Sequence, residues 1–197
     1  MRVLLASNNA HKLREFREIL SDWEIVSLRE AGLDVDPEET GETFAENAYL
    51  KAAAVMKASG MAAIADDSGL CVDALHGEPG VRSARYAGPH ETDSAALCAY
   101  LLKKLGDEPN RTARFVSCIC CVFPDGSTVT AQGSCEGEIV YAPRGENGFG
   151  YDPVFAPVEM PGRSMAELTP EEKNAISHRG RSLRAFRREF ANREDKV

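Results

Sequence analysis

The sequence contains no apolar run of the length that crosses a membrane. A bilayer-spanning helix needs about 20 consecutive apolar residues, and no stretch of the 197 residues approaches this. The apolar segment from Val3 to Ala6 is too short for the core of a signal peptide and runs directly into Asn8 and Asn9. We therefore expect a cytoplasmic protein with no membrane partner.

Positive charge is also in short supply. Lys and Arg number 23 against 31 Asp and Glu, which gives a formal net charge of −8. A general polyanion binder carries an excess of positive charge, so we expect no nucleic-acid partner. A phosphate ligand would require a local cluster of Lys and Arg, helped by a metal ion.

The six cysteines do not form the pattern of a disulfide framework. Cys118, Cys120 and Cys121 lie within an otherwise apolar segment, which favours buried free thiols of a reducing compartment over zinc ligands. Internal repeats and low-complexity linkers are missing as well, so composition marks no domain boundary. The length suits one large domain or two lobes that share a core.

Two adjacent carboxylates follow a short apolar run. If residues 61–65 form a buried strand, Asp66 and Asp67 emerge at its carboxyl end, where open α/β sheets place their ligand crevices. Neighbouring carboxylates repel each other as anions. A Mg²⁺ ion held by one or two carboxylates and by substrate phosphates would neutralise them. The alternative is a structural Asp-Asp-Ser-Gly turn after the strand.

The amino-terminal segment predicts a strand, a polar turn and a helix. Residues 2–6 read as the strand, 7–9 supply capping residues, and apolar residues from 13 to 20 recur at helical spacing. The start of this helix offers a partial positive charge to an anion, and Lys12 adds a full one. The alternative is an ordinary capped helix with a solvated Lys12.

The next segment predicts an acidic loop followed by a capped helix. Residues 29–42 are acidic and lack periodicity, and 43–46 form a capping box that opens a helix ending at Gly60. Asn47 and Lys51 lie away from the apolar stripe of this helix. They belong either to a solvated face or to the lining of a cleft.

The second half predicts a further helix and a β-hairpin. Thr92 or Asp93 caps a helix that ends at Gly106 and points Leu97, Leu101 and Leu105 inward. Residues 113–123 read as a long apolar strand, and a Pro-Asp-Gly-Ser turn leads into a second strand over 128–134. The sheet is therefore expected to be mixed.

The last third contains a glycine-rich aromatic loop and a long helix. The loop at 145–153 carries rings that either stack on a flat ligand or anchor the loop against the core. Thr169 caps a helix predicted to continue to about Asn192. The arginines of that helix form either a solvated face or a surface for an acidic partner.

Five blocks match one family in order and spacing over nearly the whole chain. They are Ser7-Asn8-Asn9-Ala10-His11-Lys12, Thr43-Phe44-Ala45-Glu46-Asn47-Ala48 with Lys51, Ala65-Asp66-Asp67-Ser68-Gly69-Leu70, Phe149-Gly150-Tyr151-Asp152-Pro153 and Glu172-Lys173-Asn174-Ala175-Ile176-Ser177-His178-Arg179. On these motifs the chain resembles the inosine triphosphate pyrophosphatases, also called non-canonical purine nucleoside triphosphate pyrophosphatases. The first block often begins Thr-Gly-Asn in that family, where this chain has Ser-Asn-Asn.

The resemblance implies an α/β fold in which an elongated central mixed β-sheet is flanked by helices and splits into two lobes, with the active cleft between them. It implies one such domain over residues 1–197 and a homodimer. The implied activity is hydrolysis of ITP, dITP and XTP to the monophosphate and pyrophosphate with Mg²⁺, which removes deaminated purines from the nucleotide pool. The alternatives are a related pyrophosphatase for pyrimidine or modified nucleotides and a non-catalytic binder of nucleotides or nucleic acid.

The resemblance also implies roles for individual residues. Asp67 aligns with the family's metal ligand and proton acceptor, and Glu38 with a second metal ligand, with the adjacent Glu39 as an alternative. Asp66 would be a further ligand or would orient the ligands. The implied triphosphate-binding residues are Ser7, Asn8, Asn9, Ala10, His11, Lys12, Lys51 and Ser68. The implied base-binding residues are Phe149, Gly150, Tyr151, Asp152, Lys173, His178 and Arg179.

Donors aimed at the 6-oxo oxygen of the purine would account for rejection of adenine. The donors of Lys173, His178 and Arg179 would be left unpaired opposite an amine, and such mismatches are worth several powers of ten. On an ideal helix, however, Lys173 and Arg179 point in different directions. We expect the helix to lie across the cleft with both edges touching the nucleotide, rather than to break near Ser177.

Overall fold

The computed structural model describes residues 1–88 and 93–194. The helices are α1 (Ala10–Ile19), α2 (Phe44–Ser59), α3 (Ser94–Leu105), α4 (Pro170–Ile176) and α5 (His178–Glu194). The strands are β1 (Arg2–Leu5), β2 (Glu24–Ser27), β3 (Ala63–Val72), β4 (Thr112–Val122), β5 (Thr128–Ile139) and β6 (Phe155–Pro157). Short 3₁₀ turns lie at Asp73–Leu75, Gly80–Arg85, Asp152–Val154 and Met165–Glu167.

The chain divides into two compact units, each built from separate stretches of sequence. Unit 1 contains Met1–Asp67, Ser117–Gly133 and the residues from Arg179 onward, and unit 2 contains Ser68–Val116 and Ser134–His178. The chain therefore passes from one unit to the other four times, within strands β3, β4 and β5 and at the start of α5. Nothing in the composition changes at these positions, which is why the sequence marks no boundary.

The strands form a mixed sheet in the order β2-β1-β3-β4-β5-β6. Strand β1 pairs in parallel with β2 and β3, whereas β5 pairs antiparallel with β6. A tight turn joins β4 to its neighbour β5, with the Gly126 amide donating to the Phe123 carbonyl over 2.9 Å. The predicted mixed sheet and the predicted hairpin are confirmed.

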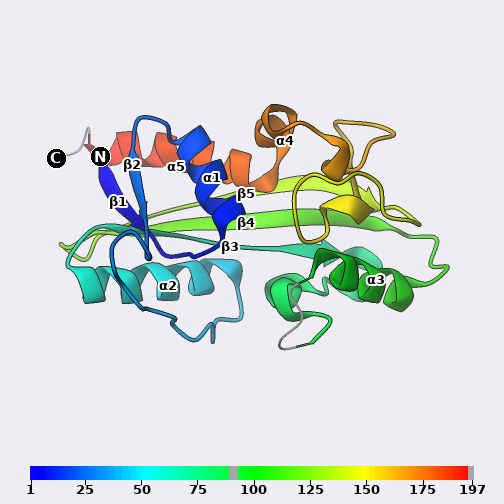
Figure 1. The fold of residues 1–197 in the computed structure, drawn as a ribbon, viewed down its shortest axis with the longest axis horizontal. Coiled ribbons are helices and arrows are strands. Elements are labelled where there is room, and N and C mark those ends of the chain that lie inside the picture. Colours follow the sequence, from blue (N-terminus) through cyan, green and yellow to red (C-terminus); the bar gives the residue numbers. More distant parts are fainter. Residues whose placement is uncertain (89–92, 195–197) are drawn as a thin grey trace. The chain divides into compact units, whose positions relative to one another are not determined.

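In unit 1, apolar side chains cover both faces of the strands. One cluster packs α1 and α5 against β1 through residues such as Leu5, Phe16 and Phe186. The other packs α2 through Ala52 and Val55. Figure 1 shows α2 on one side of β1, with α1 and α5 on the other. The helical spacing of apolar residues in the sequence predicts the buried faces of α1 and α2 correctly, because a helix with one apolar stripe must bury it.

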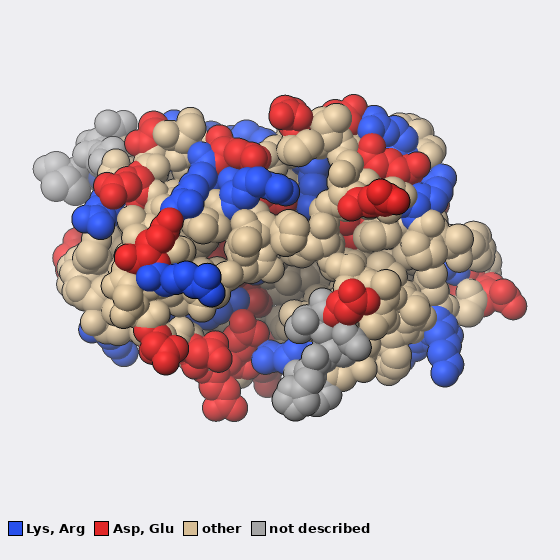
Figure 2. Space-filling model, viewed as in Figure 1, with Lys and Arg blue, Asp and Glu red and all other residues tan. Residues whose placement is uncertain are grey.

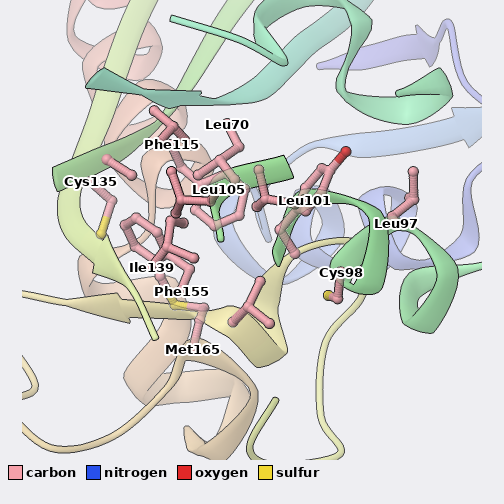
Figure 3. Packing of buried hydrophobic residues seen from close by; sticks show 14 of the residues in the cluster. Leu70, Leu97, Cys98, Leu101, Leu105, Phe115, Cys135, Ile139, Phe155 and Met165 are labelled. Atoms are coloured by element: carbon pink, nitrogen blue, oxygen red, sulfur yellow. The ribbon is translucent and has the colours of Figure 1, made fainter. Parts of the chain in front are cut away.

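Unit 2 has a core of its own. The leucines predicted to point inward from α3, Leu97, Leu101 and Leu105, are all buried in it (Figure 3). Phe115 and Phe155 meet edge to face within this cluster, with ring centroids 4.7 Å apart. These contacts hold the elements that carry the aromatic loop.

The ends of α2 and α3 follow the predicted capping chemistry. Thr43 and Glu46 form the capping box of α2, and Gly60 ends it in the left-handed conformation with φ +68°. The carboxylate of Asp93 caps α3 by accepting from the Ala96 amide over 3.0 Å. The other candidate for this cap, Thr92, lies outside the described residues.

The prediction that Asp66 and Asp67 follow the end of a strand is wrong, and so is the alternative of a turn. Both lie within the ten-residue strand β3, which continues to Val72. A turn exposes unpaired carboxylates to water. Here both carboxylates are paired with cations inside the unit, so the strand continues through them.

The prediction of one helix from Thr169 to about Asn192 is also wrong. Ser177 is extended, with ψ 154°, and separates α4 from α5. Serine is a residue typical of the position before a helix, and a new helix begins at His178. Lys173 and Arg179 therefore belong to different helices, and their directions are set independently. The expected helix lying across a cleft is not present.

All six cysteines are free thiols, and five of them are buried. Burial raises the pKa of Cys98 and of Cys121 to about 12, so these thiols stay protonated near neutral pH. Among the described helices, none combines the length and the apolar character that a membrane span requires.

Candidate functional site

Strand β3 directs two adjacent carboxylates to opposite faces of unit 1, because successive side chains of a strand alternate. The Asp66 carboxylate meets residues from α1 and α5, whereas the Asp67 carboxylate meets Lys51 of α2. Both are almost fully buried, at 2% and 6% exposed. One strand thus supplies two differently surrounded anions within a single peptide unit.

The carboxylate of Asp66 is held by two cations and a hydroxyl. Its Oδ2 lies 2.8 Å from Nζ of Lys12 and 2.9 Å from Nη2 of Arg179. Its Oδ1 accepts from the Ser117 hydroxyl over 2.6 Å. Burial by itself raises the pKa of Asp66, but the charges of Arg179 and Lys12 outweigh it and hold the pKa well below the usual range. Asp66 is therefore an anchor that stays ionised near neutral pH.

Arg179 is one of the largest fully buried side chains in the chain. It bridges Asp66 and Glu15, with Nη1 2.5 Å from Glu15 Oε2. The Ser182 hydroxyl lies 2.8 Å from that of Ser117 and extends the network. Sequence reasoning missed Glu15, Ser117 and Ser182. The one available signal was Glu15, an acid next to the buried Phe16 of an amphipathic helix.

The surroundings of Asp67 are simpler. Nζ of Lys51 lies 2.7 Å from Asp67 Oδ1 and 3.1 Å from Glu39 Oε1. The second oxygen of Asp67, Oδ2, is buried and has no hydrogen-bond partner within the described part of the chain. Burial raises the pKa of Asp67 above its usual value, and Lys51 offsets this in part. Asp67 therefore has a carboxylate oxygen without a hydrogen-bond partner among the described residues, and it is more basic than Asp66.

Beyond the end of β1, Lys12 and Lys51 both reach the backbone of β3. Strand β1 pairs with β3 only as far as Leu5 opposite Ile64. Beyond this point the Asp66 carbonyl accepts from Nζ of Lys51 over 3.1 Å and from Nζ of Lys12 over 3.3 Å. The open edge of β3 therefore brings both ammonium groups to one peptide.

The segment between β1 and α1 is built as predicted. Asn9 caps α1 by accepting from the amides of His11 and Lys12, at 2.9 and 3.1 Å. The Ser7 hydroxyl in turn accepts from the Asn9 amide over 3.1 Å. Residues 8–11 are exposed. Since the cap already satisfies two of the helix amides, attraction of an anion here rests on the helix dipole and on the Lys12 ammonium.

In unit 2, the aromatic loop is tied to α4. Asp152 Oδ2 lies 2.7 Å from Nζ of Lys173 and accepts from the Phe149 amide over 2.9 Å. The Lys173 ammonium also lies 4.8 Å from the centre of the Phe149 ring. Phe149 is half-buried, so its ring retains an accessible surface. This part of unit 2 combines one ring, one buried cation and one buried anion.

The same loop also contains the anchor that the sequence left as an alternative. Tyr151 is buried, and its hydroxyl donates to the Ser83 carbonyl over 2.8 Å. The Gly150 amide donates to the Ser94 hydroxyl over 2.7 Å. The anchoring interpretation therefore holds for Tyr151, and the stacking of Phe149 on a flat ligand stays a prediction.

The remaining predicted residues are distributed over both units. His178 is buried in unit 2 and stacks on Phe115, with ring centroids 4.7 Å apart and planes at 14°. Arg179, predicted to bind the base with His178 and Lys173, makes ion pairs with Glu15 and Asp66 of unit 1. Glu38 is exposed, whereas Glu39 shares Lys51 with Asp67. These contacts favour Glu39 as the second carboxylate near Asp67.

The described residues hold no group of three or more His, Cys, Asp or Glu side chains that would enclose a metal ion. Asp67 and Glu39 supply two carboxylates at one ammonium group. Mg²⁺ is usually bound by one or two carboxylates and completes its shell with water and substrate phosphates. The donor set fits such an ion, provided that a phosphate ligand contributes.

Comparison with known proteins gives matches along most of the chain. The profile of the Ham1 family matches residues 3–189. A dITP/XTP pyrophosphatase of Gluconobacter oxydans is 50% identical over 186 residues, which cover 94% of this chain and 88% of that protein. The solved structure of the Staphylococcus aureus Ham1 protein is 43% identical, covers 100% of both chains and superposes with a TM-score of 0.86. A Mycobacterium abscessus structure described as a nucleoside-triphosphatase / dITP/XTP pyrophosphatase is 49% identical, covers 94% of this chain and 98% of its own, and has a TM-score of 0.76.

Proposed function

This chain belongs to the Ham1 family, and on that basis we propose that it hydrolyses non-canonical purine nucleoside triphosphates, namely dITP, XTP and ITP, to the monophosphate and pyrophosphate. The observation that carries the proposal is the pair of carboxylates on β3. Asp66 is held by cations, and Asp67 has an oxygen without a hydrogen-bond partner among the described residues. The names of the relatives in Gluconobacter oxydans and Mycobacterium abscessus support the substrate class.

Hydrolysis of a triphosphate requires charge neutralisation, an aligned water and a proton acceptor. Lys12 and Lys51 supply two cations at the open edge of β3. We assign to Asp67 the removal of the proton from the attacking water, because its raised pKa makes it a better base than an ordinary carboxylate. Asp66 and Arg179 hold this arrangement in place without reacting.

The divalent cation of the reaction is proposed to be Mg²⁺. Its protein ligands would be Asp67, whose Oδ2 is buried without a partner among the described groups, and Glu39, which the Lys51 contact places nearby. When bound, such an ion neutralises triphosphate charge and lowers the pKa of water. Asp67 and Glu39 would hold the ion at the edge of β3 where Lys12 and Lys51 would attract the anionic substrate.

Recognition of the base is proposed to reside in unit 2. Phe149 offers a ring on which a purine stacks, and Lys173 offers a buried donor for the 6-oxo oxygen. An adenine would place its amine opposite this donor and leave it unpaired, which disfavours binding strongly. His178 would add a second donor next to Phe115. A cytoplasmic location, which suits the free thiols, and a homodimer, which the family resemblance implies, are also part of the proposal.

The test is a substrate panel with purified protein. Equal concentrations of dITP, XTP, dATP, dGTP and dCTP are incubated with and without Mg²⁺, and pyrophosphate is measured. We expect fast release from dITP and XTP, little from the other nucleotides, and none after chelation of the metal. Equal rates on dATP and dITP, or preference for dCTP, would replace this proposal with that of a pyrophosphatase of another specificity. Binding without release would indicate a nucleotide-binding protein.

A further inference from the structure

Lys51 contacts the same oxygens that a divalent cation would need. Its ammonium lies 2.7 Å from Asp67 Oδ1 and 3.1 Å from Glu39 Oε1. These are hydrogen-bonding distances for a charged donor. The side chain of Lys51 is only 12% exposed. Water would therefore solvate the ammonium poorly if it left these carboxylates.

We propose that Lys51 competes with the divalent cation for Asp67 and Glu39, and that the triphosphate relieves this competition by binding the Lys51 ammonium. Lys51 thereby couples nucleotide binding to metal binding, so that the metal site is completed only with a nucleotide. This inference rests on the proposed function and adds to it an order of binding.

Charge arithmetic supports the competition. Asp67 and Glu39 carry two negative charges, and Lys51 cancels one of them locally. A divalent ion at these oxygens would have the ammonium as a near neighbour of like charge, and repulsion at such distances weakens binding by about tenfold or more even with strong screening. Electrostatics therefore favours either the ammonium or the metal at these oxygens and disfavours the presence of both at the same time.

The surroundings of the ammonium show where it can go. Nζ of Lys51 also donates to the Asp66 carbonyl, as does Nζ of Lys12. A triphosphate oxygen at this edge of β3 would offer Lys51 an anionic partner in place of Asp67. The described chain offers no third carboxylate for the metal, and triphosphate oxygens would supply the missing ligands. The triphosphate would thus remove Lys51 from the carboxylates and also supply the remaining ligands of the metal ion.

The acidic segment before α2 gives a second reason for a cation in this place. Five exposed or half-buried acids precede α2, the helix that carries Lys51; they are Asp34, Asp36, Glu38, Glu39 and Glu42. In Figure 2, acidic side chains gather where Figure 1 draws α2 and the segment leading into it. Free divalent ions would be attracted to this surface, and a competing lysine keeps Asp67 available for the nucleotide complex.

The experiment measures Mn²⁺ binding in the absence of nucleotide, by the loss of the free-ion electron paramagnetic resonance signal at pH 8. Lys51→Met removes the charge and preserves the length of the side chain, and we expect it to bind Mn²⁺ about tenfold or more tightly than the wild type. Lys51→Arg retains the charge and is expected to bind like the wild type. Lys12→Met is the matched control, because Lys12 pairs with Asp66 instead of Asp67.

Three outcomes decide the inference. A gain in Lys51→Met that disappears in Lys51→Met/Asp67→Asn supports it. An unchanged or weaker affinity in folded Lys51→Met, or an equal gain in Lys12→Met, overturns it. If Lys51→Met does not fold, Lys51→Gln replaces it under the same criteria. The proposed function is tested separately by pyrophosphate release from dITP with wild-type protein, so either can fail without the other.

Discussion

Asp66 and Asp67 are neighbours in the chain, yet the pKa of one is lowered and the pKa of the other is raised. Both are buried, and burial raises the pKa of a carboxyl group. For Asp66 the ion pairs with Arg179 and Lys12 outweigh this effect. For Asp67 the single ion pair with Lys51 does not. The alternation of side chains along β3 therefore gives two adjacent residues different chemical roles.

Replacement of Asp67 by Asn is expected to abolish turnover while the fold stays intact. The amide cannot accept a proton and is a poor ligand for Mg²⁺, and loss of a general base costs about 10²–10⁴-fold in rate. Pyrophosphate release from dITP measures turnover, and a thermal melt measures the fold. A variant that retains a wild-type rate would remove Asp67 from the mechanism.

Replacement of Arg179 by Met is expected to destabilise unit 1. It leaves Asp66 and Glu15 as buried carboxylates that have lost their guanidinium, and breaking a buried ion pair from one side costs about 3–5 kcal/mol. Urea unfolding gives the free energy of unfolding. The matched control is Arg187→Met, at a residue of the same helix as Arg179. It removes an exposed ion pair with Asp22 and should cost less than about 1 kcal/mol. Equal losses in the two variants would contradict the structural role of the buried network.

The sequence was sufficient for those features that local chemistry decides. The Asn9 cap, the Thr43 capping box and the Gly60 terminus all lie where the sequence predicts them. Spacing also predicts the buried leucines of α3, and the Pro-Asp-Gly-Ser turn predicts the hairpin that makes the sheet mixed. In each case a few neighbouring residues determine the outcome, because caps and amphipathic stripes are local signals.

Features that depend on distant partners could not be predicted. The strand continues through Asp66 because Arg179, more than a hundred residues away, neutralises the charge. The break at Ser177 separates Lys173 from Arg179 without any proline or glycine to mark it. The choice between Glu38 and Glu39 depends on where Lys51 points. The family resemblance supplied candidate residues for the site but not which of them contact each other.

Acid is expected to remove the stabilisation that Asp66 provides. The pKa of Asp66 in the folded protein lies well below its ordinary value of 3.8, so its contribution is complete above that value and is lost as the pH falls below it toward the folded pKa. The expected slope in this window is up to about 1.4 kcal/mol per pH unit for one proton.

Urea unfolding of wild type and Asp66→Asn between pH 6 and pH 3 isolates this contribution. Other carboxylates also titrate in acid, since Arg17 holds the pKa of Glu30 at about 2 and Arg163 holds that of Glu172 at about 2. Because both proteins share these groups, the difference between them reports Asp66. A difference that stays constant over this pH range would show that folding does not lower the pKa of Asp66.

Replacement of Gly148 by Ala is expected to weaken nucleotide binding. Its φ of +78° is unfavourable for alanine, and the added Cβ would lie 2.0 Å from Asp152 Oδ2. Gly126 has a similar φ of +81° but open space around its Cβ position. Gly126→Ala therefore carries only the backbone cost, about 1 kcal/mol. We expect a raised KM for dITP in Gly148→Ala and an unchanged KM in Gly126→Ala, and equal KM values would contradict a role for the Asp152 contacts in binding.

Replacement of Lys173 by Met is expected to reduce discrimination between dITP and dATP. The buried ammonium is the donor that an adenine amine would leave unpaired, so its removal should lower kcat/KM for dITP by about 10²-fold or more and change that for dATP little. Asp152→Asn provides the contrast, because it retains the donor but removes its ionic partner. This variant should preserve much of the preference for dITP.

The comparison separates recognition from loop structure. Asp152 also accepts from the Phe149 amide, so a purely structural role of the Asp152–Lys173 pair would make both variants lose activity on dITP and dATP in parallel. Selective loss on dITP in Lys173→Met alone means that the ammonium contacts the base. Parallel loss in both would mean that Lys173 only positions Phe149, and the donor for the 6-oxo oxygen would then have to be sought at His178.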